Sequence, residues 1–165
     1  MWKYTVLFCF AVLLIGCKQE KPELVDEQAA PEAFSMQNYP TLIELEPEVL
    51  PIVNSWPEFM AMENSFSVLK RATSTEDVKL AITDLIAQEK ALAEGDYPQA
   101  FDRLQIKSRQ QVFRTFLYKV RGNLQDNRDI DEAMQQMVKA YNGYKNQFNV
   151  ISGNTLDAKL ILDEE

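Results

Sequence analysis

The sequence predicts an all-α protein, an up-down-up-down four-helix bundle that is preceded by a flexible acidic tether. Four segments between residues 55 and 152 repeat apolar residues every three or four positions, which is the period of one face of an α-helix. The connections between these segments are short, so consecutive helices should be antiparallel neighbours. Six of the seven prolines lie between positions 22 and 57, where regular helix is therefore not expected. A three-helix bundle with the first segment packed across it is the alternative.

The first two segments carry recognisable helix starts. Ser55 and Glu58 form a capping-box pattern, and Pro57 suits a first helical turn. Residues 73–76 form a second capping-box pattern, and Gly95 is placed to end that helix. The two apolar stripes are Phe59, Met62, Phe66 and Leu69, and then Val78, Ile82, Leu85 and Leu92.

The third segment starts near Pro98, and Gly122 marks its expected end. The fourth starts near Asp129 and has a coiled-coil-like seam. The stripe of the third segment is Ile106, Phe113, Phe116, Leu117 and Val120, and the seam of the fourth is Ile130, Met134, Met137, Tyr141, Tyr144, Phe148 and Ile151. The tail, residues 153–165, is ambiguous, because its apolar residues alternate as in a strand although no partner strand is expected.

The N-terminal residues resemble the start of a bacterial lipoprotein. The apolar run 6–15 would span about 15 Å as a helix, half of a bilayer's ~30 Å hydrocarbon core, so it suits a signal peptide better than a membrane span. The run ends in Leu14-Ile15-Gly16-Cys17, which resembles the lipobox of bacterial lipoproteins. An ordinary secreted protein with a cysteine near its start, or a membrane anchor, is the alternative.

The lipobox resemblance implies a location. It implies that residues 1–16 are a signal peptide, that Cys17 receives lipid, and that the acyl chains hold the protein on a membrane. Lys18 stands where an aspartate usually retains Gram-negative lipoproteins in the inner membrane, so the sequence resembles the outer-membrane sorting pattern. We expect a protein of the cell envelope, anchored in the outer membrane of a Gram-negative bacterium.

The composition of the expected mature chain excludes several kinds of function. It would have 149 residues (165 minus 16) and a net side-chain charge of −9 (16 minus 25), which argues against binding nucleic acid. Cys9 would leave with the signal and Cys17 would be lipidated, so we expect no disulfide within the mature chain. Histidine is absent, which excludes Ser-His-Asp and Cys-His catalysis and His-ligated zinc or haem. We expect no cofactor, no metal and no enzymatic activity.

The mature chain divides into four parts. Residues 17–39 are predicted to be an acidic, proline-containing tether. Residues 40–54 hold too many large aliphatic side chains to remain in water, so we expect an irregular arm that packs on the bundle. The bundle covers residues 55–152, and the tail follows.

A basic stripe on the third predicted helix is a candidate binding surface. Arg103, Lys107, Arg114 and Arg121 project within about 40° of one another at 100° per residue. They could pair with acids of neighbouring helices or remain solvated, or they could bind an anionic partner such as lipid phosphates, an acidic polysaccharide or an acidic protein.

Two charged residues lie on predicted apolar faces. Arg109 lies in the apolar arc of the third helix, and Glu89 lies on the seam of the second. They could form a structural polar pair or extend to water, or Arg109 could bind a carboxylate or phosphate inside the bundle. Methionines at positions 60, 62, 134 and 137 could bind Cu(I), but their positions favour core packing.

These features predict a lipid-anchored lipoprotein whose helical bundle binds a protein partner or has an accessory structural role. The alternative is a module that binds a small ligand in the bundle interior around Arg109.

Overall fold

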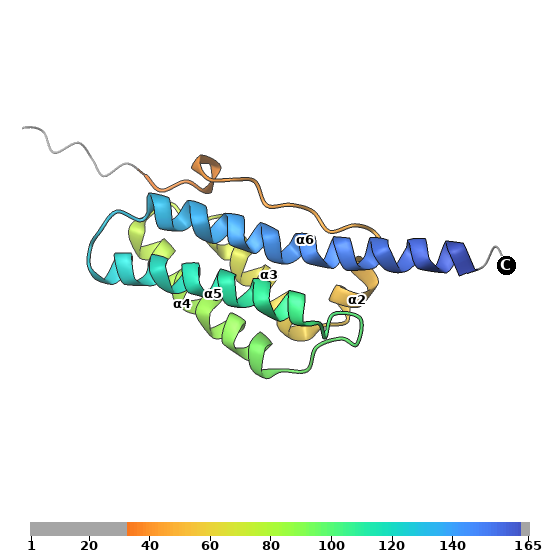
Figure 1. The fold of residues 1–165 in the computed structure, drawn as a ribbon. Helices are drawn as coiled ribbons and strands as arrows, with labels where there is room; N and C mark the ends of the chain where they lie inside the picture. Colours follow the sequence, from red (N-terminus) through yellow and green to blue (C-terminus); the bar gives the residue numbers. More distant parts are fainter. Residues whose placement is uncertain (1–32, 163–165) are drawn as a thin grey trace, which may run out of the picture. The chain divides into compact units, whose positions relative to one another are not determined.

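The computed structural model describes the backbone of residues 33–162 and the side chains of residues 33–153. Within this range all regular secondary structure is helical, without strands, so the predicted all-α class is confirmed. Figure 1 shows the helices packed together. The elements are a 3-10 helix η2 (Met36–Asn38) and the α-helices α2 (Leu50–Asn54), α3 (Pro57–Leu69), α4 (Thr75–Glu94), α5 (Leu104–Gln125) and α6 (Asp131–Leu162).

Helix α3 begins at Pro57 without the capping box that we predicted for Ser55 and Glu58. Trp56 precedes the helix, and its side chain makes no capping hydrogen bond. The Ser55 hydroxyl donates instead to the carbonyl of Ile52 at 2.8 Å. The predicted capping box was wrong because Ser55 closes the short helix α2 and its hydroxyl is used there.

Helix α4 does start with a capping box, one residue later than predicted. The Ser74 hydroxyl accepts from the N–H of Asp77 at 3.1 Å, and the Asp77 carboxylate accepts from the N–H of Ser74 at 3.2 Å. Hydrogen bonds to the Asp77 carboxylate, chiefly from the N–H of Thr73, lower the pKa of this carboxyl below its ordinary 3.8. Gly95 ends the helix as predicted and donates its N–H to the carbonyl of Ala91 at 2.9 Å.

Helix α5 begins at Leu104, later than the predicted start near Pro98. The residues between them form turns, in which the N–H groups of Phe101 and Asp102 donate to the carbonyl of Pro98 at 2.8 and 2.9 Å. Phe101 is completely buried. Its burial holds this connection against the core, so the chain turns there instead of starting the helix at once.

The predicted stop of α5 at Gly122 is also wrong, because the helix continues to Gln125. Asn127 then takes a left-handed conformation with φ 50°. The N–H of Arg128 donates to the carbonyl of Asn123 at 2.8 Å, which is the long hydrogen bond of a Schellman ending. Asparagine tolerates the left-handed region better than most residues, so Asn127 supplies the ending that we had expected of glycine.

Helix α6 begins at Asp131, whose N–H donates to the Asp129 carboxylate at 2.9 Å. Its backbone remains helical to Leu162, beyond the end predicted at residue 152. The alternation of apolar residues in the tail therefore does not mark a strand. A strand needs a partner for its backbone groups, whereas a continuing helix satisfies them within the segment.

Neighbouring helices pack in sequence order, α2 on α3, α3 on α4, α4 on α5 and α5 on α6. The stripes predicted for α3 and α4 are buried in full. Of the stripes predicted for α5 and α6, Phe116, Ile130 and Ile151 are only partly buried, and the other residues are buried. Hydrophobic periodicity therefore identified most of the core.

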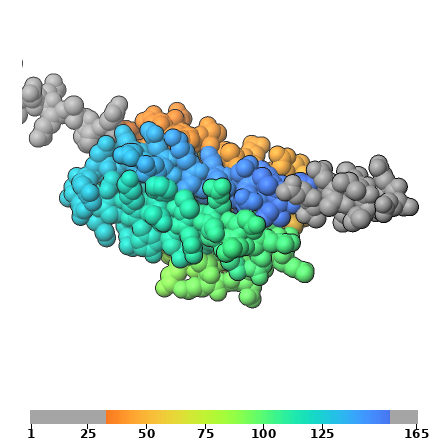
Figure 2. Space-filling model, viewed as in Figure 1, coloured from red at the N-terminus to blue at the C-terminus, as the bar shows by residue number. Residues whose placement is uncertain are grey.

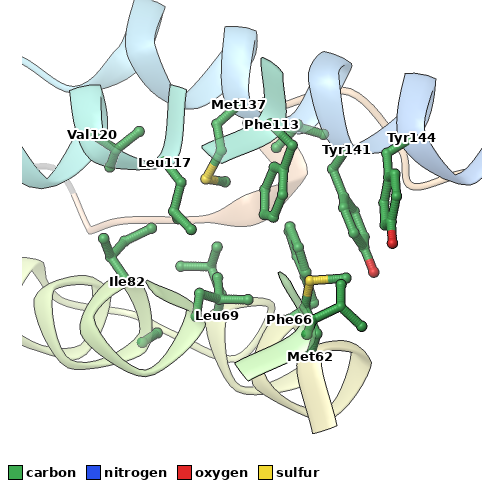
Figure 3. Close-up of a cluster of buried hydrophobic side chains, with 14 of the residues drawn as sticks. Met62, Phe66, Leu69, Ile82, Phe113, Leu117, Val120, Met137, Tyr141 and Tyr144 are labelled. Carbon is green, nitrogen blue, oxygen red and sulfur yellow. The ribbon is translucent and has the colours of Figure 1, made fainter. Parts of the chain in front are cut away.

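Aromatic rings from α3, α5 and α6 meet in the core (Figure 3). The ring of Phe66 stacks on that of Tyr141 with centroids 3.9 Å apart, and the Phe113 ring lies 5.0 Å from Tyr141. Phe59 packs edge-on against Phe148 at 5.4 Å. Full burial of such side chains contributes about 1.5–3 kcal/mol each. These contacts connect α3 with α6, which are far apart in the sequence.

Part of the predicted arm lies extended along α6 (Figure 1). This segment, residues 40–46, is called the arm below. The side-chain amide of Asn142 accepts from the N–H of Ile43 at 3.0 Å and donates to the carbonyl of Thr41 at 2.8 Å. Asn142 thus pairs with the arm backbone on both sides of Leu42, as a neighbouring strand would.

Asn149, seven residues further along α6, repeats this arrangement. It accepts from the N–H of Glu46 at 3.0 Å and donates to the carbonyl of Glu44 at 3.2 Å. Because both asparagines bind backbone groups, they hold the arm in its extended conformation whatever side chains it carries.

The packed part of the chain begins before residue 40, where the tether was predicted to end. Phe34, Met36 and Tyr39 are partly buried against the core. The Tyr39 hydroxyl donates to the carboxylate of Asp131 at 2.7 Å. Burial, and then this hydrogen bond, raise the pKa of Tyr39 above its ordinary value.

Candidate functional site

Glu89 is the centre of a buried polar cluster between α4 and α5. Glu89 is 1 % exposed, as its position on the predicted seam indicated. The amide of Gln110 donates to one carboxylate oxygen at 2.9 Å, and Nε of Arg114 donates to the other at 2.7 Å. The carboxylate therefore has a neutral and a charged partner, as a buried charge requires.

Arg109 does not belong to this cluster, and of the alternatives left open for it, a polar pair with Glu89 or extension to water, its exposed position agrees with the second. It is exposed, whereas the next residue, Gln110, is 2 % exposed. The buried arc of α5 is centred on Phe113 and Leu117. At 100° per residue, Arg109 lies beyond the edge of that arc and Gln110 lies within it. Our predicted arc was too wide on the side of Phe116, which is only partly buried.

Tyr97, in the connection between α4 and α5, extends the cluster. Its hydroxyl donates to the side-chain oxygen of Gln110, so both ends of this amide are used. Burial, and then the charge of Glu89, raise the pKa of Tyr97 to about 12. The hydroxyl therefore stays protonated at neutral pH and keeps Gln110 turned with its amide group toward Glu89.

The predicted basic stripe divides into residues with different surroundings. Lys107 pairs with Asp102 at 2.5 Å, and Arg114 pairs with Glu89. The Arg121 guanidinium packs over the ring of Tyr118 at 4.4 Å. Arg103 is exposed, and its Nε makes a long hydrogen bond of 3.5 Å to the carbonyl of Ala100. Ion pairing thus accounts for two of the four residues.

Two hollows flank Arg114. The first has a volume of about 240 Å³ and the second about 310 Å³. The first is lined by Ala93, Gly95, Tyr97, Lys107, Gln110, Gln111 and Arg114. The second is lined by Glu89, Lys90, Ala93, Glu94, Arg114 and Tyr118. Only the first combines two cationic side chains with no acidic residue.

Sequence reasoning missed a second polar cluster, on the side of the core that faces the arm. Lys145 is 6 % exposed, and its Nζ lies 3.2 Å from a carboxylate oxygen of Glu63. The buried Tyr141 hydroxyl donates to the same carboxylate. Glu63 and Lys145 line a cavity of about 460 Å³ beside the arm. The sequence did carry a signal for the burial of Lys145, because this lysine follows the seam residue Tyr141 by four positions and so lies near the same face of the helix.

The arm contacts of Asn142 and Asn149 were also missed. Their separation of seven residues places them on one face of α6, which is a signal that the sequence does carry. It does not indicate which segment they bind, because they pair with backbone groups that every residue possesses.

The remaining predictions concern metals and membranes. Met62, Met134 and Met137 are fully buried core residues. The described part of the chain has no group of three or more His, Cys, Asp or Glu side chains that could hold a metal ion. None of its helices is long and apolar enough to cross a membrane. Cys17 lies outside the described residues, so its predicted lipidation stays a prediction.

The chain was also compared with known proteins. It matches no known protein-family profile, no curated protein and no solved structure.

Proposed function

We propose that this protein is a lipid-anchored lipoprotein of the bacterial cell envelope, carried by the outer membrane of a Gram-negative cell. The support is the apolar run that ends in Leu14-Ile15-Gly16-Cys17, with Lys18 after it. Acyl chains on Cys17 would hold the protein on the membrane, and the tether would connect them to the helical domain. The asparagine contacts along α6 support this arrangement, because they fasten the arm through which the tether would join the domain.

The domain itself is proposed to be an up-down-up-down four-helix bundle made of α3, α4, α5 and α6. The short connections and the packing of consecutive helices support this topology. Helix α2 and the arm would then be additions to the bundle.

The proposed role of the bundle is non-enzymatic binding of an acidic protein partner. The observation that carries this proposal is the charge of α5. This helix contains five basic residues and no acidic residue, on a chain whose net charge is −8. Such a local concentration of positive charge favours encounter with a negatively charged surface.

Helix α5 also offers apolar side chains to a partner. Leu104 is 78 % exposed, and Val112 and Tyr118 are 44 % and 39 % exposed. Figure 2 shows α5 open on the surface, between α6 and α4. Exposed apolar groups beside basic ones are typical of protein interfaces, in which aromatic and arginine side chains are enriched.

The test is partner capture from intact cells by crosslinking, with the combined variant Arg103→Glu and Leu104→Glu. These two residues suit the test better than Lys107 and Arg114, which are held in ion pairs. We expect an acidic partner to be captured by the native protein and lost with this variant. The matched control, Lys139→Glu with Val150→Glu, changes an exposed lysine and an exposed aliphatic residue of α6 and should leave capture intact. Equal capture by all three proteins contradicts docking through α5.

A second candidate function, binding of a small ligand, is favoured by the two hollows beside Arg114. The sequence suggested Arg109 for this role, but Arg109 is exposed. Arg114 is the better candidate, because it is held by the buried Glu89 and lines both hollows.

A further inference from the structure

Arg114 is held in a way that leaves its binding edge free. Its Nε donates to the buried carboxylate of Glu89 at 2.7 Å. Its two terminal nitrogens make no hydrogen bond within the described residues, and the side chain is 37 % exposed. These nitrogens form the edge that binds a carboxylate through two parallel hydrogen bonds. The bond of Nε therefore orients the guanidinium, and its two terminal nitrogens remain available to a ligand.

Buried groups keep that orientation. Gln110 donates to Glu89 and accepts from the Tyr97 hydroxyl, so the carboxylate that holds Arg114 cannot rotate freely. Glu89 and Gln110 are 1 % and 2 % exposed. Since little conformational freedom remains to be lost, an anion that binds Arg114 would have a small ordering cost.

The first hollow that Arg114 lines is suited to a small anion. Its volume of about 240 Å³ is below the usual range of drug-sized pockets, about 300–1,000 Å³. Arg114 and Lys107 are its charged lining residues, and Gln110 and Gln111 also line it.

Lys107 can contribute its charge because its present partner is exchangeable. The ion pair with Asp102 is exposed, with 47 % and 56 % of the two side chains accessible. Exposed pairs of this kind contribute little stability, about 0–1 kcal/mol. Lys107 Nζ also lies 5.0 Å from the centre of the Tyr97 ring, at the wall of the hollow.

We propose that this hollow binds a small dicarboxylate. Arg114 donates two hydrogen bonds to one carboxylate, and Lys107 exchanges Asp102 for the other. The ligand binds unchanged, without any covalent step. This site is independent of the lipid anchor, and it does not use the exposed residues Arg103 and Leu104 on which the docking test depends.

The experiment uses ¹⁵N-labelled full-length protein and succinate as the probe, with the side-chain Nε–H signal of Arg114 as the readout. We expect a saturable shift of this signal at succinate concentrations up to about 10 mM, which would saturate a site with a Kd near 1 mM. Absence of a saturable shift in the native protein overturns the proposal, whatever the variants do.

Three substitutions test the assignment. Arg114→Lys keeps the charge but loses the planar pair of donors, so we expect affinity at least about tenfold lower, read from backbone amides that line the hollow. Lys107→Gln should weaken binding several-fold and should reduce the preference for succinate over acetate. Arg109→Gln removes an exposed arginine of the same helix that does not line the hollow, and it should change affinity less than twofold. Equal loss with Arg109→Gln and Arg114→Lys contradicts a specific site.

A second arm of the experiment separates a free ligand from a protein carboxylate. Tetraglutamate is titrated under the same conditions. Binding of succinate that persists when tetraglutamate fails to bind supports a site for small molecules. Saturation by tetraglutamate with none by succinate overturns the proposal and places the carboxylate on a protein. Failure of partner capture, by contrast, would leave the succinate result unchanged.

Discussion

Glu89 and Arg109 both lie on predicted apolar helix faces, yet only Glu89 is buried. Glu89 lies at the centre of its stripe, where α4 packs on α5, and it has two hydrogen-bond partners there. Arg109 lies at the edge of its stripe and extends to water. Periodicity located the buried carboxylate but could not identify its partners, because the partners depend on how two helices are placed against each other.

Substitution of these two residues by alanine should destabilise the protein to different extents. Glu89→Ala removes the side-chain acceptor of the buried Gln110 amide and leaves it only the long 3.4 Å bond to the carbonyl of residue 89, so we expect the free energy of unfolding to fall by about 1–3 kcal/mol. Arg114 is partly exposed and can be rehydrated, which limits the loss. Arg109→Ala should remain within about 0.5 kcal/mol of the native protein. Urea unfolding of both variants measures this, and similar values for the two would contradict the assignment.

At the scale of elements, the helix interiors were predicted well and their ends less well. The stripes of α3 and α4 are buried as expected, because burial of an apolar face dominates the choice of helix. The ends depend on single hydrogen bonds that compete locally. Ser55 serves α2 instead of α3, and Asn127 ends α5 in place of Gly122.

The arm is the element that the sequence left least determined. The aliphatic residues of the predicted segment 40–54 indicated that it would pack, and its prolines indicated an irregular course. The path of the arm along α6 depends on hydrogen bonds from the side chains of Asn142 and Asn149 to the backbone of the arm. Because these bonds do not involve the arm's side chains, the sequence of the arm does not reveal them.

Removing those bonds should loosen the arm without unfolding the helices. In the double variant Asn142→Ala and Asn149→Ala, we expect the amides of Ile43 and Glu46 to exchange hydrogen at least about tenfold faster. A factor of ten corresponds to about 1.4 kcal/mol of local stability, which is the scale of one or two hydrogen bonds. Hydrogen exchange measured by NMR follows each amide separately.

The control for this experiment is Asn146→Ala, an exposed asparagine on α6 between the other two. It should leave exchange in the arm unchanged. If the double variant also exchanges at the native rate, the asparagine contacts do not hold the arm.

For the whole molecule, composition and pattern predicted the all-helical class and most of the core. They also brought Glu89 and Arg114 to attention, but on separate grounds, one as a buried charge and the other as part of a stripe. Their contact joins α4 and α5, and no linear pattern states which residue of one helix faces which residue of another. The same limit applies to Glu63 and Lys145.

The account of where the protein acts depends on Cys17. The described domain has a basic helix, α5, and an arm fastened along α6, and the proposed lipid would supply the membrane location. One chemical modification therefore connects the sequence to the proposed role.

Mass spectrometry of the protein purified from its native membranes tests that modification most directly. The account predicts an N-terminal peptide that begins at Cys17 and carries a diacylglyceryl group on sulfur, with residues 1–16 removed. An unmodified Cys17 thiol, or a chain that still carries residues 1–16, would contradict it.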